Sequence, residues 1–371
     1  MSAAPAPASP AGRGGTFISI IRATMRTLTV LLATATVALA QPPPALPTLV
    51  RLEQAAPRAH PKLKLPKPHT VGPVIPGLMQ GVTPQGLAFW ERQNWFLVSC
   101  YFPEEDGRPS VVVAIDAKTG KLVRCLTLVE ASGRPHAGHV GGLAVSDKYL
   151  WVGSGRLYRV PLADVVAAQP VAHLRLQPPF HAECNASYIA CHDKRVWIGE
   201  FVSLEDGVEA TPGHFLKDRN NTDKYAWIAG YALDADENLS GTAGGNRPPP
   251  AAILSVRQKV QGLAFLNGRI VLSASYGRTN HSTLAAYTNP LEAERDKPHR
   301  TVKVGDATVP VWFLDGKNRE WEIDDFPPMS EGIAAYGRRL GVIFESGAAK
   351  YQKGGHGPID TVLLLTPPAG K

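Results

Sequence analysis

The chain has 371 residues, of which 44% are hydrophobic and 19% charged, with 35 glycines and 33 prolines. This composition excludes a disordered chain and a coiled coil, and it is typical of a turn-rich, all-β globular protein. The formal net charge of +7 is not backed by a cluster of basic residues, so we expect no nucleic-acid partner.

The first 40 residues have the pattern of a secretory signal. Residues 27–40 are apolar, follow Arg26 and end in Ala38-Leu39-Ala40, which is the order of regions in a signal peptide. This stretch is too short to cross a bilayer, which takes about 20 apolar residues. We therefore expect residues 1–40 to be a signal peptide with an N-terminal extension, and the mature protein to be secreted or periplasmic without a stable membrane span.

Residues 41–68 are rich in proline and predict an extended linker, which leaves residues 69–371 as the folded domain. Export would permit disulfides among the four cysteines, which are Cys100, Cys125, Cys184 and Cys191. Four cysteines allow three pairings. A strand between Cys184 and Cys191 would hold that pair about 23 Å apart, and buried free thiols are the alternative.

An internal repeat predicts the fold. Five small, apolar strands of similar sequence lie at residues 84–89, 140–145, 186–191, 260–265 and 330–335. Each is followed by a polar turn and a strand rich in branched and aromatic residues, at 96–101, 150–155, 196–201, 270–275 and 341–346. Five matching hairpins favour an all-β, five-bladed β-propeller, with a β-sandwich as the alternative.

Further strands complete each predicted blade. Third strands are expected at residues 110–116, 156–162, 225–234, 283–288 and 360–365, and fourth strands at 122–128, 171–177, 251–257 and 309–315. The last unit has no fourth strand of its own. We expect residues 69–76 to pair with it as an outer, N-terminal closing strand, because this gives four-stranded antiparallel blades and leaves fewer open edges.

Four short motifs point to relatives. Gln261-Gly-Leu-Ala, Ser275-Tyr-Gly-Arg278, Met329-Ser-Glu-Gly332 and Phe344-Glu-Ser-Gly-Ala348 resemble segments of exported bacterial β-propeller proteins of undefined function, over roughly residues 80–366. More remotely, the hairpins are similar to the blades of SMP-30/gluconolactonase and NHL-like propellers. The lactonase resemblance implies a calcium ion in the central channel, held by acidic and amide side chains, although those enzymes have six blades.

The site follows from the predicted geometry, because the starts of the first strands and the ends of the second strands meet at one mouth of a propeller channel. The ligand-binding residues predicted there, or in the linkers beside it, are Gln85, His139, His181, Glu183, Glu200, Gln261, Ser275, Tyr276, Glu331 and Glu345. Carboxylates are calcium ligands, so Glu200, Glu331 and Glu345 form a candidate metal site. The alternative is that Glu331 and Glu345 pair with arginines and tie blades together.

The sequence therefore predicts a secreted propeller that binds a small molecule, a glycan or a peptide at the channel mouth. The alternative is a calcium-dependent hydrolase of esters or lactones. The chain has no Gly-x-Ser-x-Gly, His-Glu-x-x-His, phosphate-binding Gly-Lys-Ser/Thr or Cys-x-x-Cys motif, which disfavours elbow-type hydrolases, zinc proteases and nucleotide enzymes. Two long loops, residues 203–224 and 346–358, are either lids over this mouth or insertions.

Overall fold

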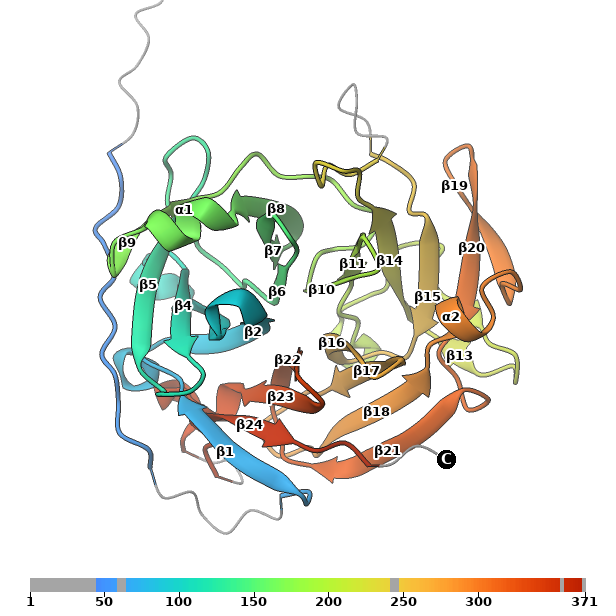
Figure 1. Ribbon diagram of the computed structural model, residues 1–371. Coiled ribbons are helices and arrows are strands. Elements are labelled where there is room, and N and C mark those ends of the chain that lie inside the picture. Colours follow the sequence, from blue (N-terminus) through green and yellow to red (C-terminus); the bar gives the residue numbers. More distant parts are fainter. Residues whose placement is uncertain (1–44, 59–64, 241–246, 354–356, 369–371) are drawn as a thin grey trace, which may run out of the picture. The chain divides into compact units, whose positions relative to one another are not determined.

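Five inner strands form a ring, and each begins a separate sheet. They are β2 (Thr83–Trp90), β6 (Gly142–Val145), β10 (Tyr188–His192), β16 (Val260–Leu266) and β22 (Ser330–Tyr336). The sheets are arranged as the predicted five-bladed β-propeller (Figure 1). This computed structural model describes residues 45–58, 65–240, 247–353 and 357–368, so the predicted signal peptide, residues 1–40, lies outside the described residues.

Glycine is required where neighbouring inner strands meet. A Cβ atom on Gly332 would lie 2.5 Å from the backbone nitrogen of Leu87, and one on Gly142 would lie 2.8 Å from that of Ile189. Both contacts are with backbone of the next blade, which cannot rotate away as a side chain can. The small residues of the sequence repeat therefore allow the inner strands to pack closely around the channel.

Blades 1 and 2 follow in chain order. Blade 1 contains β2, β3 (Trp95–Tyr101), β4 (Val111–Asp116) and β5 (Leu122–Val129), and blade 2 contains β6, β7 (Tyr149–Ser154) and β8 (Arg156–Pro161), followed by α1 (Leu162–Ala167). The expected fourth strand of blade 2 is wrong: β9 (Val171–Arg175) pairs in parallel with β5 on the edge of blade 1. Its Leu174 packs into the core cluster between these two blades.

Blades 3 and 4 show a similar exchange. Blade 3 contains β10, β11 (Arg195–Gly199), β14 (Ala226–Ala232) and β15 (Ala252–Val256), and blade 4 contains β16, β17 (Arg269–Ala274), β18 (Ser282–Thr288) and β21 (Arg319–Phe326). The prediction that residues 309–315 close blade 4 is wrong. They belong to β20 (Ala307–Phe313), which pairs in parallel with β15, and β19 (Arg300–Val304) pairs with β20.

The outer strand of blade 4, β21, carries a charged and aromatic pattern that the sequence repeat did not reveal. Phe326 packs inward while Asp324 and Asp325 face solvent. The more apolar β20 buries Val309, Val311 and Phe313 against blade 3 instead. An edge strand such as β21 needs only one apolar face. The more apolar β20 therefore lies in the more buried position, against blade 3.

Blade 5 contains β22, β23 (Arg339–Phe344), β24 (Thr361–Leu365) and β1 (His69–Val74). β1 pairs antiparallel with β24, with His69 opposite Leu365 and Thr70 opposite Leu364. The predicted closure of the last blade by an N-terminal strand is therefore confirmed. The core consists of five clusters, and each one fills the space between two adjacent blades.

The remaining elements are short. They are the hairpin β12 (Leu216–Lys217) and β13 (Asp223–Lys224), α2 (Pro290–Ala293), and the 3-10 turns η1 (Leu78–Gln80), η2 (Glu91–Gln93), η3 (Glu104–Asp106), η4 (Leu204–Asp206), η5 (Glu345–Gly347) and η6 (Ala349–Tyr351). Within the described ranges, no helix has both the length and the apolar character needed to cross a membrane.

Residues 45–58 of the expected linker run along the outside of the propeller and contact it, as Figure 1 shows in blue. Leu52 is buried in the cluster between blades 5 and 1. Val50 donates its backbone N–H to Thr127 Oγ1 at 2.9 Å, and Arg58 pairs with Asp360 at 3.0 Å. All four cysteines are free thiols.

Candidate functional site

A cavity of about 550 Å³ lies at the end of the channel where the inner strands begin. Each blade contributes two residues. One precedes the third position of its inner-strand repeat, and the other lies at the end of its second strand or one or two positions after it. These ten residues, which define the channel mouth, are Gln85 and Tyr101, Gly141 and Gly155, Ser187 and Phe201, Gln261 and Ser275, and Glu331 and Glu345. The channel mouth therefore has the fivefold pattern of the sequence repeat, although its side chains differ from blade to blade.

Glu200 does not belong to the channel mouth, and the predicted metal site of Glu200, Glu331 and Glu345 is therefore not assembled. In β17 the residue paired with Val260 is Ala274, whereas in β23 the residue paired with Ser330 is Phe344. Glu345 is thus equivalent to Ser275. In blade 3, Gly199 pairs with Tyr188 as Ser273 pairs with Gly262 in blade 4, so Glu200 is equivalent to Ala274. Successive side chains of a strand point to opposite faces, so this difference of one position turns Glu200 into the interior of blade 3.

Two buried carboxyl groups, Glu331 and Glu345, remain at the channel mouth and are called the carboxyl pair below. Gln261 Nε2 donates a hydrogen bond to Glu331 Oε1 at 3.2 Å. Gln85 Nε2 donates to Glu345 Oε1 at 2.7 Å, and the Tyr101 hydroxyl donates to the same oxygen at 3.3 Å. A glutamine from a neighbouring blade therefore holds each carboxyl group in position.

The carboxyl pair is shifted toward its protonated form. Burial, and then the neighbouring charge of Glu345, raises the pKa of Glu331 well above its usual range. Burial also raises the pKa of Glu345 to about 7, although Lys350 and the Tyr101 hydroxyl oppose this rise. Near neutral pH the site therefore contains a protonated Glu331 that can donate a hydrogen bond, and a Glu345 that is close to its own titration point.

Aromatic and basic side chains surround the carboxyl pair. The rings of Tyr101 and His139 stack with centroids 4.1 Å apart, and Lys350 Nζ lies 4.4 Å from the centroid of the Tyr101 ring. Burial lowers the pKa of both His139 and Lys350. On the other side, the rings of Phe201 and Tyr276 stack at 6.1 Å.

Seven of the ten predicted ligand-binding residues line this cavity: Gln85, His139, Gln261, Ser275, Tyr276, Glu331 and Glu345. His181 is exposed and does not line it. Glu183 lies 3.6 Å from Arg247, and its backbone N–H donates to the Tyr231 hydroxyl. Both residues follow Phe180, which pairs with Leu157 in the outer strand of blade 2. The linker reaches the cavity only after them, at Asn185, Ala186 and Ser187.

Eleven of the lining residues were absent from the predicted set, and four of these have an aromatic or charged side chain: Tyr101, Phe201, Arg278 and Tyr351. Tyr101 and Phe201 occupy the same position as Ser275 in their blades, so a register based on strand pairing would have found them. Tyr351 comes from η6 in the long loop after β23. Its ring lies 4.8 Å from the Arg278 guanidinium and 4.6 Å from Lys350 Nζ, a contact that nothing in the repeat predicts.

The channel mouth does not fit the calcium ion that the lactonase resemblance implies. Calcium takes six to eight oxygen ligands, usually including several carboxylates. The channel mouth offers two carboxyl groups, one of which has a strongly raised pKa, and the charges of Lys350 and Arg278 act on the other. Asp234, in the loop that begins like a calcium site, instead accepts the backbone N–H groups of Asp236 and Asn238.

No protein-family model matches the chain, and no curated protein does either. Among solved structures, the chain resembles glutaminyl cyclase from Myxococcus xanthus, with 10% identity, a TM-score of 0.38, and coverage of 80% of this chain and 94% of that one. It also resembles the GH43 β-xylosidase/α-arabinofuranosidase CoXyl43 from a compost microbial metagenome, with 12% identity, a TM-score of 0.43, and coverage of 82% and 97%.

A third similar structure is BamB from Moraxella catarrhalis, with 10% identity, a TM-score of 0.31, and coverage of 88% of this chain and 99% of that one. None of these similarities carries information about the activity of this chain. The resemblance to SMP-30 and NHL-like propellers has no matching family model and stays a prediction.

Proposed function

We propose that the protein binds a neutral, hydroxyl-rich small molecule, such as a sugar unit of a glycan, at the channel mouth. The observation that carries this proposal is the carboxyl pair held between two glutamines at the base of a cavity of about 550 Å³. A cavity of this volume is of the size that small-molecule sites usually have. The signal expected in residues 1–40 would place this activity outside the cytoplasm.

The carboxyl pair and its partners favour hydroxyl groups. A protonated Glu331 donates a hydrogen bond, an ionised Glu345 accepts one, and each glutamine amide does both. A hydroxyl group also donates and accepts, so it can replace the water that would otherwise satisfy these buried atoms.

Charge and aromatic surface limit the ligand further. Near neutral pH the carboxyl pair carries no more than one negative charge, and the positive charges of Lys350 and Arg278 act on it, so the site disfavours a cationic ligand. The rings of Tyr101, Phe201, Tyr276 and Tyr351 provide flat apolar surfaces beside the polar base. Rings with a polar edge suit a molecule that has both apolar faces and hydroxyl groups.

Isothermal titration of the full chain with a panel of mono- and oligosaccharides at pH 7 tests this proposal. We expect one saccharide class to bind, and Glu345→Gln to weaken it by about 10- to 100-fold, because a hydrogen bond to a charged group contributes about 1.5–3 kcal/mol. Glu91→Gln, on the exposed turn η2, is the matched control and should leave binding unchanged. Binding only of peptides, or of no member of the panel, would contradict the proposal.

Hydrolysis of an ester or lactone at the same mouth is the second candidate, and the pKa of Glu345 near 7 favours it. A general base works best when its pKa is close to the working pH. Glu345 would take a proton from the attacking water, while the protonated Glu331 would donate a hydrogen bond to the carbonyl oxygen. We expect the wild-type protein to hydrolyse a member of an ester and lactone panel both with and without chelator, and Glu345→Gln to lose this activity. That result would support hydrolysis over binding alone.

A further inference from the structure

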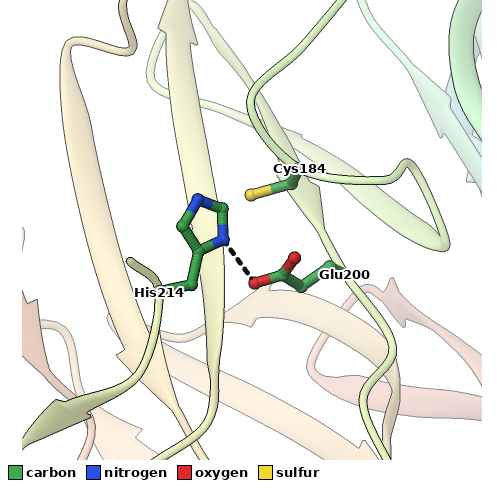
Figure 2. A group of neighbouring side chains, drawn as sticks. All are labelled: Cys184, Glu200 and His214. Carbon is green, nitrogen blue, oxygen red and sulfur yellow. Dashed lines mark hydrogen bonds and ion pairs between the residues drawn. The ribbon is translucent and has the colours of Figure 1, made fainter. Parts of the chain in front are cut away.

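Glu200, which the channel mouth excludes, meets a cysteine and a histidine inside blade 3. Cys184, Glu200 and His214 are each no more than 3% exposed, and one ligand atom from each lies within 4.8 Å of the other two (Figure 2). These three residues are called the blade 3 cluster below. They come from three separate segments: the linker before β10, the end of β11, and the long loop before β12.

Hydrogen bonds hold two members of the blade 3 cluster in place. His214 Nδ1 and Glu200 Oε1 are 2.6 Å apart, as the dashed line in Figure 2 marks. The Trp227 backbone N–H donates to Glu200 Oε1 at 3.0 Å, and the Thr211 hydroxyl donates to Oε2 at 2.6 Å. The His214 ring also stacks on the Trp227 ring at 3.8 Å. The imidazole and the carboxylate are therefore positioned by their surroundings and not by each other alone.

The ion-pair partner of the buried Glu200 carboxylate is a histidine, which can itself bind a metal. Among the described residues, no lysine or arginine forms an ion pair with Glu200, and His214 is its only basic neighbour within ion-pair distance. An isolated buried carboxylate is costly unless it is paired or coordinates a metal. Cys184 is equally buried, and its thiol donates to the Trp227 carbonyl at 3.5 Å.

We propose that Cys184, Glu200 and His214 bind a zinc ion, with a water molecule as the fourth ligand. Thiolate, imidazole and carboxylate are the ligands that zinc takes in tetrahedral sites, and the soft thiolate disfavours calcium and magnesium. The ion takes the place of the proton between His214 Nδ1 and Glu200. Zinc–ligand distances of about 2.0–2.2 Å then require Nδ1 and Oε1 to move about 3.3 Å apart. The Cys184 thiol loses its proton on binding.

Such an ion would have a structural role close to the channel mouth. It would join the linker before β10 and the loop at residues 203–224 to blade 3, none of which is cross-linked by a disulfide among the described residues. Phe201, the residue after Glu200, lines the channel mouth. Zinc binding therefore fixes one wall of the ligand cavity, and its removal should loosen the loop at residues 203–224.

Metal analysis of the full chain, expressed with zinc in the medium and purified reduced and without chelator, tests the proposal. We expect about one zinc per chain, since the site has a single set of ligands. Protein expressed with cobalt should show a thiolate-to-cobalt charge-transfer band in the near ultraviolet. Chelator should lower the melting temperature of the zinc protein, because a ligand of the native state stabilises it.

Variants assign the ligands. Cys184→Ser should abolish the cobalt charge-transfer band and His214→Gln should lose most of the zinc, whereas Cys191→Ser, in β10 of the same blade, should keep both. Wild-type protein that carries less than about one-tenth of a zinc per chain and shows no cobalt band would overturn the proposal, even if the variants do not fold. A different resident metal, or full zinc content in Cys184→Ser, would also overturn it.

Discussion

Gln85 and Glu345 are joined by a hydrogen bond of 2.7 Å, although 260 residues separate them along the chain. Gln85 belongs to the first blade and Glu345 follows the second strand of the last. The bond therefore crosses the junction between the last blade and the first. Glu331 and Glu345 are brought together by the hairpin of β22 and β23, and closure of the ring adds Gln85 to this carboxyl pair.

The pH dependence of stability should report the carboxyl pair. The pKa of Glu345 rises from 4.5 to about 7 on folding, so the native state binds the proton more tightly than the unfolded state. Stability contributed by this proton is present below pH 4.5 and is lost as the pH rises through 7. We expect the free energy of unfolding to fall by about 3 kcal/mol between pH 5 and pH 8.

Urea unfolding at several pH values measures this loss. Glu345→Gln removes the titrating group, so its stability should change less over the same pH range. The buried Glu331 titrates with its neighbour, and the pair is best described by one combined curve. A wild-type stability that rises from pH 5 to pH 8 would contradict the direction of the shift.

Lys350→Met should raise the pKa of Glu345 further. The Lys350 charge favours the ionised form of Glu345 and so lowers its pKa. Without this charge, the pH at which stability is lost should move upward when the variant is unfolded in urea at several pH values. Lys353→Met is the matched control, because Lys353 is exposed in the same loop. Equal curves for both variants would show that Lys350 does not act on the carboxyl pair.

Gly332→Ala should destabilise the ring of inner strands. Its Cβ would lie 2.5 Å from the Leu87 nitrogen and 2.6 Å from the Gln85 carbonyl. Because backbone of the next blade must move, we expect a loss of about 2–4 kcal/mol in the free energy of unfolding. Gly316→Ala, whose Cβ would meet no atom closer than 3.9 Å, should cost less than about 1 kcal/mol. Similar losses for both variants would refute close packing at the channel.

Leu52→Ala tests whether the segment at residues 45–58 is part of the folded domain. Leu52 is 5% exposed, whereas the nearby Leu49 is 41% exposed. We expect Leu52→Ala to lower the free energy of unfolding by about 2–4 kcal/mol and Leu49→Ala to change it by less than about 0.5 kcal/mol. If the two variants unfold alike, the segment behaves as the free linker that its prolines predict.

Strand periodicity and the repeat of small residues were sufficient to predict the propeller, its five blades and its closing strand. The reason is local: an inner strand that packs against backbone on both sides needs small residues wherever it occurs. The repeat also located five residues of the channel mouth, Gln85, Gln261, Ser275, Glu331 and Glu345, because the same two positions of each blade reach the channel.

Tertiary structure alone decided the outer strands and the separation of Glu200 from the carboxyl pair. Residues 171–175 and 307–313 joined the preceding blades in parallel because an exposed edge and an apolar surface were available there, which depends on packing between distant segments. Glu200 and Glu345 differ by one position of strand register. An alignment of sequence motifs does not reveal this shift. The shift nevertheless directs the Glu200 carboxylate into blade 3 and the Glu345 carboxylate into the channel.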